Sequence, residues 1–379
     1  MIYLDAAATA PVRREVLQAM WPYLTTEFGN PSSVHAVGEA AATALEDARR
    51  RVARAFEVRA TNVVFTAGGT EADNLAVKGL ALATPRGRHL IVSAIEHEAV
   101  LRSADYLARL HGFEVSIAPV DHDGRVDPEA VASLLRPDTT LVSVMHANNE
   151  VGTVQPVWEI AERAHAVGAL VHTDAVQSVG QLDTRIGELG VDALTFSGHK
   201  LGAPKGTGAL VLGGRHEIEP LVHGGGQERG RRSGTESVAG AVALATALEF
   251  AEAEQTSAVS AAVERDAFVS AVRSAVPTAV LTGHTTERLP RNASFVFPGV
   301  NGETILLELE RRGVLSSSGS ACAAGRTETS HVLLAMGLAD DVARSAVRFT
   351  WVHGTTPAEL AGVAESVAHS VAALRSIRS

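Results

Sequence analysis

The feature that most constrains the fold is an alternation of short apolar runs with longer helix-like segments over the first two thirds of the chain. The runs are rich in β-branched residues, which is typical of strands buried on both faces of a parallel sheet. Parallel strands need long crossovers, and segments 70–83 and 156–168 have the pattern of crossover helices. We therefore expect an α/β fold whose mainly parallel sheet has strands at 62–66, 89–95, 140–147, 169–175 and 192–197.

The pattern changes in the last third of the chain. An Ala-rich stretch at 236–275 is typical of one or two helices, and it precedes an apolar strand at 293–297, a helix at 301–313 and a C-terminal amphipathic helix. This order predicts a smaller α+β unit, to which the turn-prone N-terminal residues can cross back. The expected division is a large domain at 15–253 and a small domain at 1–14 and 254–379 that carries a mobile cysteine loop.

Composition excludes several classes of protein. A chain of 379 residues with 46% hydrophobic content can bury a substantial core, and its single cysteine cannot form an internal disulfide. The formal charge of −10 argues against a dedicated nucleic-acid surface, and no apolar run reaches the roughly 18 residues of a membrane span. We expect a cytoplasmic protein that binds neither membrane nor nucleic acid directly.

Candidate site residues lie where the predicted strands end, because parallel sheets bind ligands outside the carboxyl ends of their strands. The first strand leads into AGGTEADN, where glycines allow close backbone approach and the next helix offers free N–H groups to an anion. Gly69 and Thr70 are therefore candidates to bind a phosphate. A plain strand-to-helix turn, with Thr70 as N-cap and Asp73 three residues later, explains the same residues equally well.

The next strand ends carry His97 and the pair Asn148 and Asn149. A histidine there can stack on a ring or move protons, whereas an asparagine after a strand is commonly a turn former. The EHE triplet around His97 does not predict a metal site, because adjacent strand residues point to opposite faces and no second ligand pair follows.

Asp174 closes another apolar strand, and a buried carboxylate is costly unless a cation or several donors compensate it. A protonated pyridine nitrogen would provide that compensation, and Gln177 could reach a neighbouring ring substituent. The alternative is an aspartate that caps a helix beginning at Ala175.

Lys200 follows the last predicted strand in a chain that has only three lysines and thirty arginines. An amine that must lose its proton and form a Schiff base has to be lysine, because a guanidinium stays protonated. Ser197 and His199 flank it as candidate phosphate donors. A phosphate cradle, a buried acid and a Schiff-base lysine together predict pyridoxal 5'-phosphate as the cofactor.

Cys322, the only cysteine, lies in the segment SSSGSACAAGRTETS at 316–330. A free cysteine is usually a small buried hydrophobe, but serine, glycine and alanine neighbours offer it no core to pack against. A thiol on such a segment is accessible to chemistry.

These motifs resemble the cysteine desulfurases of the class V aminotransferase group, which are pyridoxal-phosphate enzymes of fold type I. The resemblance extends over essentially the whole chain, through YLDAAATAPV, GNPSSVHAVG, FTAGGTEADNLAVKG, VMHANNEVGTVQP, HTDAVQSVGQL, FSGHKLGAPKGTGAL, HGGGQERGRRSGTE and SSSGSACAAG. It implies a large domain with a mainly parallel sheet and a smaller α+β domain. The length of the cysteine segment is similar to that of the family's first group.

The resemblance implies a role for each matching residue. Lys200 would form the Schiff base, Asp174 would pair with the pyridine nitrogen, Gln177 would contact the ring hydroxyl, and His97 would stack on the ring and move protons. The residues implied in phosphate binding are Gly69, Thr70, Ser197, His199 and, from the partner subunit of a homodimer, Thr235. Those implied in binding the substrate carboxylate are Asn30, Asn149 and Arg348.

The implied reaction converts L-cysteine to L-alanine. Cys322 would attack the substrate sulfur and carry it as a persulfide to an acceptor protein. Iron–sulfur cluster assembly, tRNA thiolation and DNA phosphorothioation all use such enzymes, and this sequence does not select among them. Two alternatives stay open: a pyridoxal-phosphate aminotransferase or lyase acting on another amino acid, and a catalytically idle scaffold of a sulfur-transfer complex.

The sequence departs from the family pattern locally. RFTWVHGTT replaces a Leu-Gly-Arg-like continuation after Arg348, and Ala10 and Ala203 replace larger or more polar residues. Arg229, Arg231 and Arg232 could form a solvated loop or a basic rim near the cofactor. The replaced residues bear on how substrate and acceptor are bound, and they leave the residues of the main chemistry unchanged.

Overall fold

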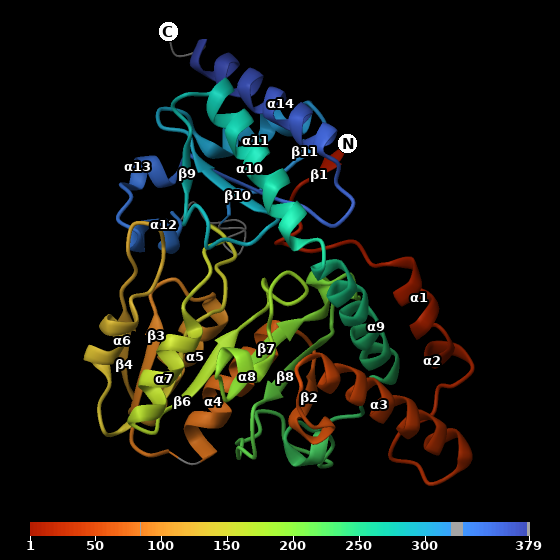
Figure 1. The fold of residues 1–379 in the computed structure, drawn as a ribbon. Coiled ribbons are helices and arrows are strands. Elements are labelled where there is room, and N and C mark those ends of the chain that lie inside the picture. Colours follow the sequence, from red (N-terminus) through yellow and green to blue (C-terminus); the bar gives the residue numbers. More distant parts are fainter. Residues whose placement is uncertain (84, 320–328, 377–379) are drawn as a thin grey trace.

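The protein is described from a computed structural model, in which residues 1–83, 85–319 and 329–376 can be described. Their largest sheet has seven strands, and β8 runs antiparallel to both of its neighbours while the other adjacent pairs are parallel (Figure 1). In spatial order the strands are β2 (Val63–Thr66), β8 (Gly208–Leu212), β7 (Ala193–Ser197), β6 (Leu170–Asp174), β5 (Thr139–Ser143), β3 (His89–Ser93) and β4 (Glu114–Ala118). This confirms the predicted α/β class.

Helices cover both faces of this sheet because its strands alternate their apolar side chains between two cores. Leu210 and Leu212 pack against the core that includes α4 and α5, whereas Ala209 and Val211 face the core that includes α3, α7 and α9. The helices associated with the sheet are α1 (Arg14–Met20), α2 (Pro22–Thr25), α3 (Ala36–Ala55), α4 (Gly69–Ala83), α5 (Glu98–His111), α6 (Pro128–Leu134), α7 (Val157–Ala166), α8 (Ile186–Leu189) and α9 (Val238–Gln255), with short 3₁₀ turns η1 (Ala60–Asn62), η2 (Gly198–Lys200) and η3 (Glu228–Gly230).

A smaller α+β unit lies above the large sheet in Figure 1. Its antiparallel sheet has the order β12-β10-β9, and its core is built around Phe268, whose ring makes edge contacts with Phe295, Phe349 and Trp351. Its elements are β9 (Val280–Thr282), β10 (Asn292–Val296), β11 (Val314–Leu315), β12 (Ala346–Thr350), α10 (Ala258–Ala275), α11 (Gly302–Arg311), α12 (His331–Ala335), α13 (Asp340–Ala343) and α14 (Pro357–Ser376).

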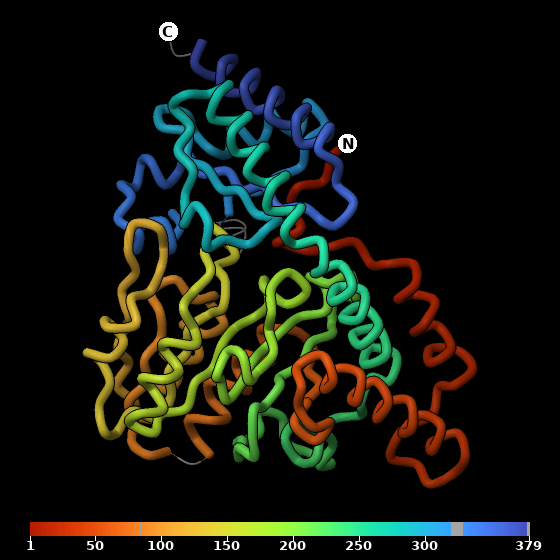
Figure 2. The backbone as a smooth tube through the Cα atoms, in the orientation of Figure 1, coloured from red at the N-terminus to blue at the C-terminus, as the bar shows by residue number. Residues whose placement is uncertain are grey.

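The N-terminal segment joins the two units. β1 (Ile2–Tyr3) pairs in parallel with β11, and the chain then passes beside the large sheet before entering α1 (Figure 2). A further apolar cluster, which includes Ile95, Met145, Val296 and Val332, packs residues of the large sheet's loops against the small unit. The exact domain boundaries stay a prediction.

All five strands predicted for the large sheet are present, each within a few residues of its expected range. The sequence reasoning missed β4, which is partly exposed at the sheet edge, and β8, which follows a stretch rich in glycine. The Ala-rich stretch forms α9 and α10, separated by a break at Thr256 and Ser257. No helix among the described residues is long and apolar enough to cross a membrane.

Candidate active site

A cavity of about 830 Å³ opens where the strands of the large sheet end, beside the small unit. Its position follows the rule that parallel sheets bind ligands outside the carboxyl ends of their strands. The structure brings ten of the predicted site residues to its wall: Gly69, Thr70, His97, Asn149, Asp174, Gln177, Ser197, His199, Lys200 and Arg348.

The N-terminus of α4 and the end of β7 form one corner of the cavity. Gly69 is tightly enclosed, since an added Cβ would lie 2.8 Å from Val176 Cγ2 and 3.4 Å from Ser197 Cβ. The Ser197 hydroxyl is buried and has no hydrogen-bond partner among the described residues. Because α4 begins at Gly69, Thr70 lies inside the first turn, and the alternative that Thr70 is the N-cap is wrong.

Asp174 ends β6 and is 5% exposed. Its Oδ1 accepts the Val176 N–H at 2.8 Å, but residues 176–181 form turns, so no helix begins at Ala175 as the capping alternative required. Burial raises the pKa of Asp174, and the nearby His97 and Lys200 oppose that shift. A cation at this carboxylate would therefore relieve an unfavourable burial.

A second carboxylate, Asp73, lies in the same cavity wall and accepts a hydrogen bond from Thr195. Burial raises the pKa of Asp73 well above its ordinary value, and the negative charge of Asp174 raises it further. Like charges in one buried site disfavour double ionisation. Asp174, at the strand end, is the carboxylate that is better placed to stay charged, because His97, Lys200 and the Val176 N–H all favour its anion.

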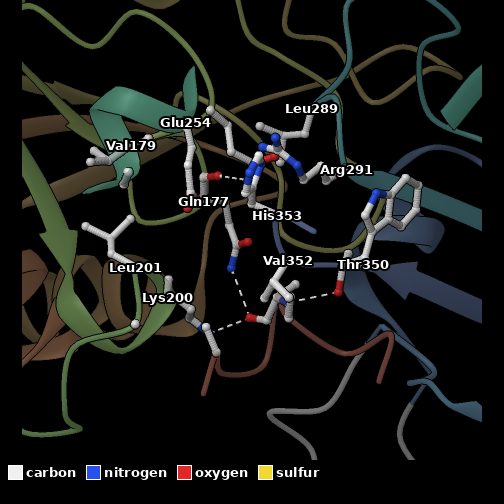
Figure 3. Close-up of a pocket in the computed structure, with 18 of the residues that line it drawn as sticks. Gln177, Val179, Lys200, Leu201, Glu254, Leu289, Arg291, Thr350, Val352 and His353 are labelled. Carbon is white, nitrogen blue, oxygen red and sulfur yellow. Dashed lines mark hydrogen bonds between the residues drawn. The ribbon is translucent and has the colours of Figure 1, made fainter. Parts of the chain in front are cut away.

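Lys200 and Gln177 converge on the N-terminal segment (Figure 3). Lys200 Nζ donates to the carbonyl oxygens of Ala7 and Ala8, the second at 2.8 Å, and Gln177 Nε2 donates to the same Ala7 oxygen at 3.1 Å. The Ala7 N–H donates to Thr350 Oγ1 at 2.8 Å. Figure 3 shows Gln177, Lys200 and Thr350 from a neighbouring cavity of about 270 Å³ that shares Gln177 and Lys200 with the larger one.

Two histidines line the large cavity in different environments. His97 caps α5, and because its Nδ1 accepts the Ala99 N–H at 3.1 Å, the proton of the neutral ring is on Nε2. Burial, together with the charges of the adjacent Lys200 and Lys205, lowers the pKa of His199 to about 4, so this ring is neutral near pH 7. His199 Nδ1 lies 3.2 Å from Thr9 Oγ1.

Arg348 approaches the cavity from β12 of the small unit and is 2% exposed. Its guanidinium donates to the Asn149 carbonyl and forms an ion pair with Asp5. Asn148, by contrast, accepts the N–H groups of Glu150 and Val151 and is a turn-forming residue.

Three predicted residues do not lie in the cavity wall. Asn30 and Thr235 are exposed, and the Asn30 side chain accepts the Ser32 N–H at 2.9 Å. Cys322 lies outside the described residues. Their roles stay predictions.

The arginines of the GRRSGTE loop are engaged within this chain. Arg232 pairs with Glu71 at 2.8 Å, Arg229 pairs with Glu46 at 3.3 Å, and Arg231 donates to the Thr61 carbonyl at 2.7 Å. The loop is therefore held against α3, α4 and η1, with Thr235 at its exposed end.

The sequence reasoning missed Asp5, Glu96 and Glu150. Glu96 and Glu150 are buried beside the cavity, where Glu96 accepts from Ser93 at 2.5 Å and Glu150 accepts from Ser330 at 2.5 Å. Burial raises the pKa of Glu96 to about 8. The EHE triplet contains Glu96 and was a local signal for it. The partners of Asp5 and Glu150 are far away in the sequence, so no local pattern could identify these two residues.

The residues present fit pyridoxal 5'-phosphate. A phosphate at the α4 N-terminus would accept hydrogen bonds from the unpartnered Ser197 hydroxyl and from the free N–H groups of the helix. Asp174 would face a ring nitrogen, and Lys200 is an amine within the same cavity. No group of three or more possible metal ligands gathers among the described residues.

Comparisons with known proteins agree with this fit. The family model "Aminotransferase class-V" matches residues 2–369. The chain is 43% identical to "Cysteine desulfurase IscS" of Dictyoglomus turgidum, over 99% of this chain and 96% of that protein. Among solved structures, a "NIFS-like protein" superimposes with a TM-score of 0.91 at 36% identity, covering 98% of this chain and 100% of the other. "SspA in complex with cysteine" gives 0.79 at 35%, covering 92% and 98%.

The fold and the site thus define an enzyme architecture of the pyridoxal-phosphate type. The chain belongs to the class-V aminotransferase family.

Proposed function

We propose that the protein is a pyridoxal-phosphate-dependent cysteine desulfurase, which converts L-cysteine to L-alanine. The observation that carries this proposal is one cavity that gathers an amine, a buried acid and a guanidinium from three elements of the fold. These are Lys200 of η2, Asp174 of β6 and Arg348 of β12. Full-length similarity to cysteine desulfurases and to a structure solved with cysteine supports the choice of substrate.

The cofactor, when bound, serves as an electron sink for the substrate's amino-acid carbon. Ser197, His199 and the α4 N-terminus would hold its phosphate, and Asp174 would hold its ring nitrogen protonated. Arg348 binds the substrate carboxylate, because a guanidinium presents paired N–H groups to two oxygens. His97 lines the same cavity, and we propose that it would stack on the cofactor and exchange protons through Nε2, since its Nδ1 is engaged by the Ala99 N–H.

The sulfur leaves the substrate by transfer to the Cys322 thiolate. The balance is L-cysteine plus an enzyme thiol giving L-alanine plus an enzyme persulfide, so no external oxidant is needed. We propose that the persulfide then passes to an acceptor protein in the cytoplasm. Iron–sulfur assembly, tRNA thiolation and DNA phosphorothioation remain the candidate pathways, and transfer of labelled sulfur to purified acceptors is the measurement that selects among them.

Two variants test the activity. Cys322→Ser should retain the visible absorbance of the bound cofactor but yield neither alanine nor persulfide, because serine is a far weaker nucleophile at neutral pH. Lys200→Ala should lose the lysine-linked absorbance. Lys78→Arg is a matched control, because Lys78 is not in the cavity wall and an arginine keeps a donor for its partner Asn74, which does line the cavity. Borohydride should attach the cofactor to Lys200. A Cys322→Ser protein that still makes alanine and persulfide would favour a general lyase.

We also propose a homodimer in which Thr235 of one subunit contacts the phosphate bound by the other. Thr235 is exposed and lies outside its own chain's large cavity, so it is available to contact the site of a second subunit. Mixing a Lys200→Ala subunit with a Thr235→Ala subunit should restore activity, since one site of each mixed dimer then carries neither lesion. Mixtures that regain no activity argue against the shared site.

A further inference from the structure

The Arg348 guanidinium is held by acceptors from three separate segments. Nη1 donates to the carbonyl oxygens of Asn149 at 2.8 Å and Gly319 at 3.3 Å, and Nη2 donates to Asp5 Oδ1 at 2.7 Å. Asn149 follows β5 and Asp5 follows β1, whereas Gly319 follows β11. The orientation of this side chain is therefore set by residues from both units of the fold.

A count of donors shows what these contacts leave available. A guanidinium has five N–H groups. Three are used by Asn149, Gly319 and Asp5, while Nε is buried and has no partner among the described residues. Nε and Nη2 share one edge of the guanidinium, the edge that binds a carboxylate with two parallel hydrogen bonds. The two unused hydrogens are thus an Nε–H and one Nη2–H.

Asp5 is well placed to fix that edge. Its carbonyl accepts the Tyr3 hydroxyl and the Ala8 N–H, each at 3.0 Å, and the residue forms a parallel bridge with Thr350. The next residues of the same segment provide the carbonyls that receive Lys200 and Gln177. The Asp5 carboxylate therefore extends from a braced backbone, and it is the only acidic side chain that forms a described ion pair with Arg348.

We propose that Asp5 is a positioning residue, which holds Nη2 so that the remaining edge of Arg348 meets the substrate α-carboxylate. This inference rests on the proposed function, because it assigns the carboxylate of an amino-acid substrate to Arg348. Asp5 does not touch the substrate. Its carboxylate occupies one Nη2 hydrogen, which leaves the other Nη2–H and the Nε–H for the substrate, and it compensates the buried charge of Arg348 when no substrate is bound.

The test compares ligands with and without a carboxylate. L-cysteine and cysteamine differ only in that group, and their binding to the cofactor-loaded enzyme can be followed through the visible absorbance, in a Cys322→Ser background that prevents turnover. Asp5→Ala should weaken the binding of L-cysteine by about tenfold or more, because losing a hydrogen bond to a charged group lowers affinity by about that factor. Cysteamine affinity should change by less than about twofold. Asp5→Asn, which keeps an acceptor oxygen, should restore most of the L-cysteine affinity.

A matched control perturbs the same segment without touching the ion pair. Tyr3→Phe removes the hydroxyl that bonds the Asp5 and Thr9 carbonyls and should leave both affinities unchanged. Equal losses for L-cysteine and cysteamine, or full L-cysteine affinity in Asp5→Ala, would overturn the positioning role. If Asp5→Ala fails to load cofactor, Asp5→Ser serves in its place with the same expectations. Failure of the proposed function is distinguishable, because the otherwise unmodified enzyme would then produce no alanine from L-cysteine.

Discussion

Ser197→Ala should have opposite effects on the protein with and without its cofactor. Ser197 ends β7, is 2% exposed, and its hydroxyl has no partner among the described residues. It lies beside Gly69, where a cofactor phosphate would sit at the start of α4. Without cofactor, the buried and unpartnered hydroxyl lowers the stability of the protein. With cofactor bound, we expect it to donate a hydrogen bond to the phosphate.

The expected magnitudes follow from the burial. A buried polar group without a partner costs about 1–3 kcal/mol, so removing it should stabilise the cofactor-free protein by about 1 kcal/mol after a small loss of packing. A hydrogen bond to a charged phosphate contributes about 1.5–3 kcal/mol. The dissociation constant of the cofactor should accordingly increase by roughly 10- to 100-fold in Ser197→Ala.

Two measurements check this. Urea unfolding after cofactor removal gives the change in the free energy of unfolding, and titration of the same protein with pyridoxal phosphate gives the dissociation constant. Ser178→Ala is a suitable control because its hydroxyl already bonds His146 at 2.9 Å, so its removal should destabilise both forms. If Ser197→Ala destabilises the cofactor-free protein and binds cofactor normally, Ser197 is a structural residue and the phosphate assignment at this corner fails.

Three further changes have defined outcomes. Burial raises the pKa of Glu96 to about 8, so its stabilising contribution is complete below about pH 4.5 and is lost as the pH rises through 8; Glu96→Gln should flatten that decline in urea midpoints measured between these values. Arg49→Met should cost about 3–5 kcal/mol of unfolding free energy, because it leaves Glu228 buried without its bidentate partner, and Glu228→Leu in the same chain should recover most of the loss. Asp174→Asn should weaken cofactor binding at least about tenfold in an absorbance titration, and unchanged affinity would contradict a charged contact to the ring nitrogen.

Local sequence signals predicted the parts of the site that come directly after strands. Asp174 and Lys200 each follow an apolar run, and their chemical types, a buried acid and a rare lysine, are unusual in such positions. The structure places both in one cavity because parallel strands end at the same edge of the sheet. The same reasoning failed for β8, since its antiparallel direction depends on pairing with β2 and β7, and nothing within Gly208–Leu212 encodes those partners.

The sequence alone determined the alternation of strands and helices, the parallel character of the sheet and the chemistry of its strand ends, because each of these depends on residues close together in the chain. Only the tertiary structure decided how Asp5 meets Arg348, how Glu150 meets Ser330, and how the N-terminal carbonyls receive Lys200. These contacts join segments separated by 343, 180 and 192 positions. Such pairs form when two separately packed cores meet, and their geometry is fixed by that packing and by no local pattern.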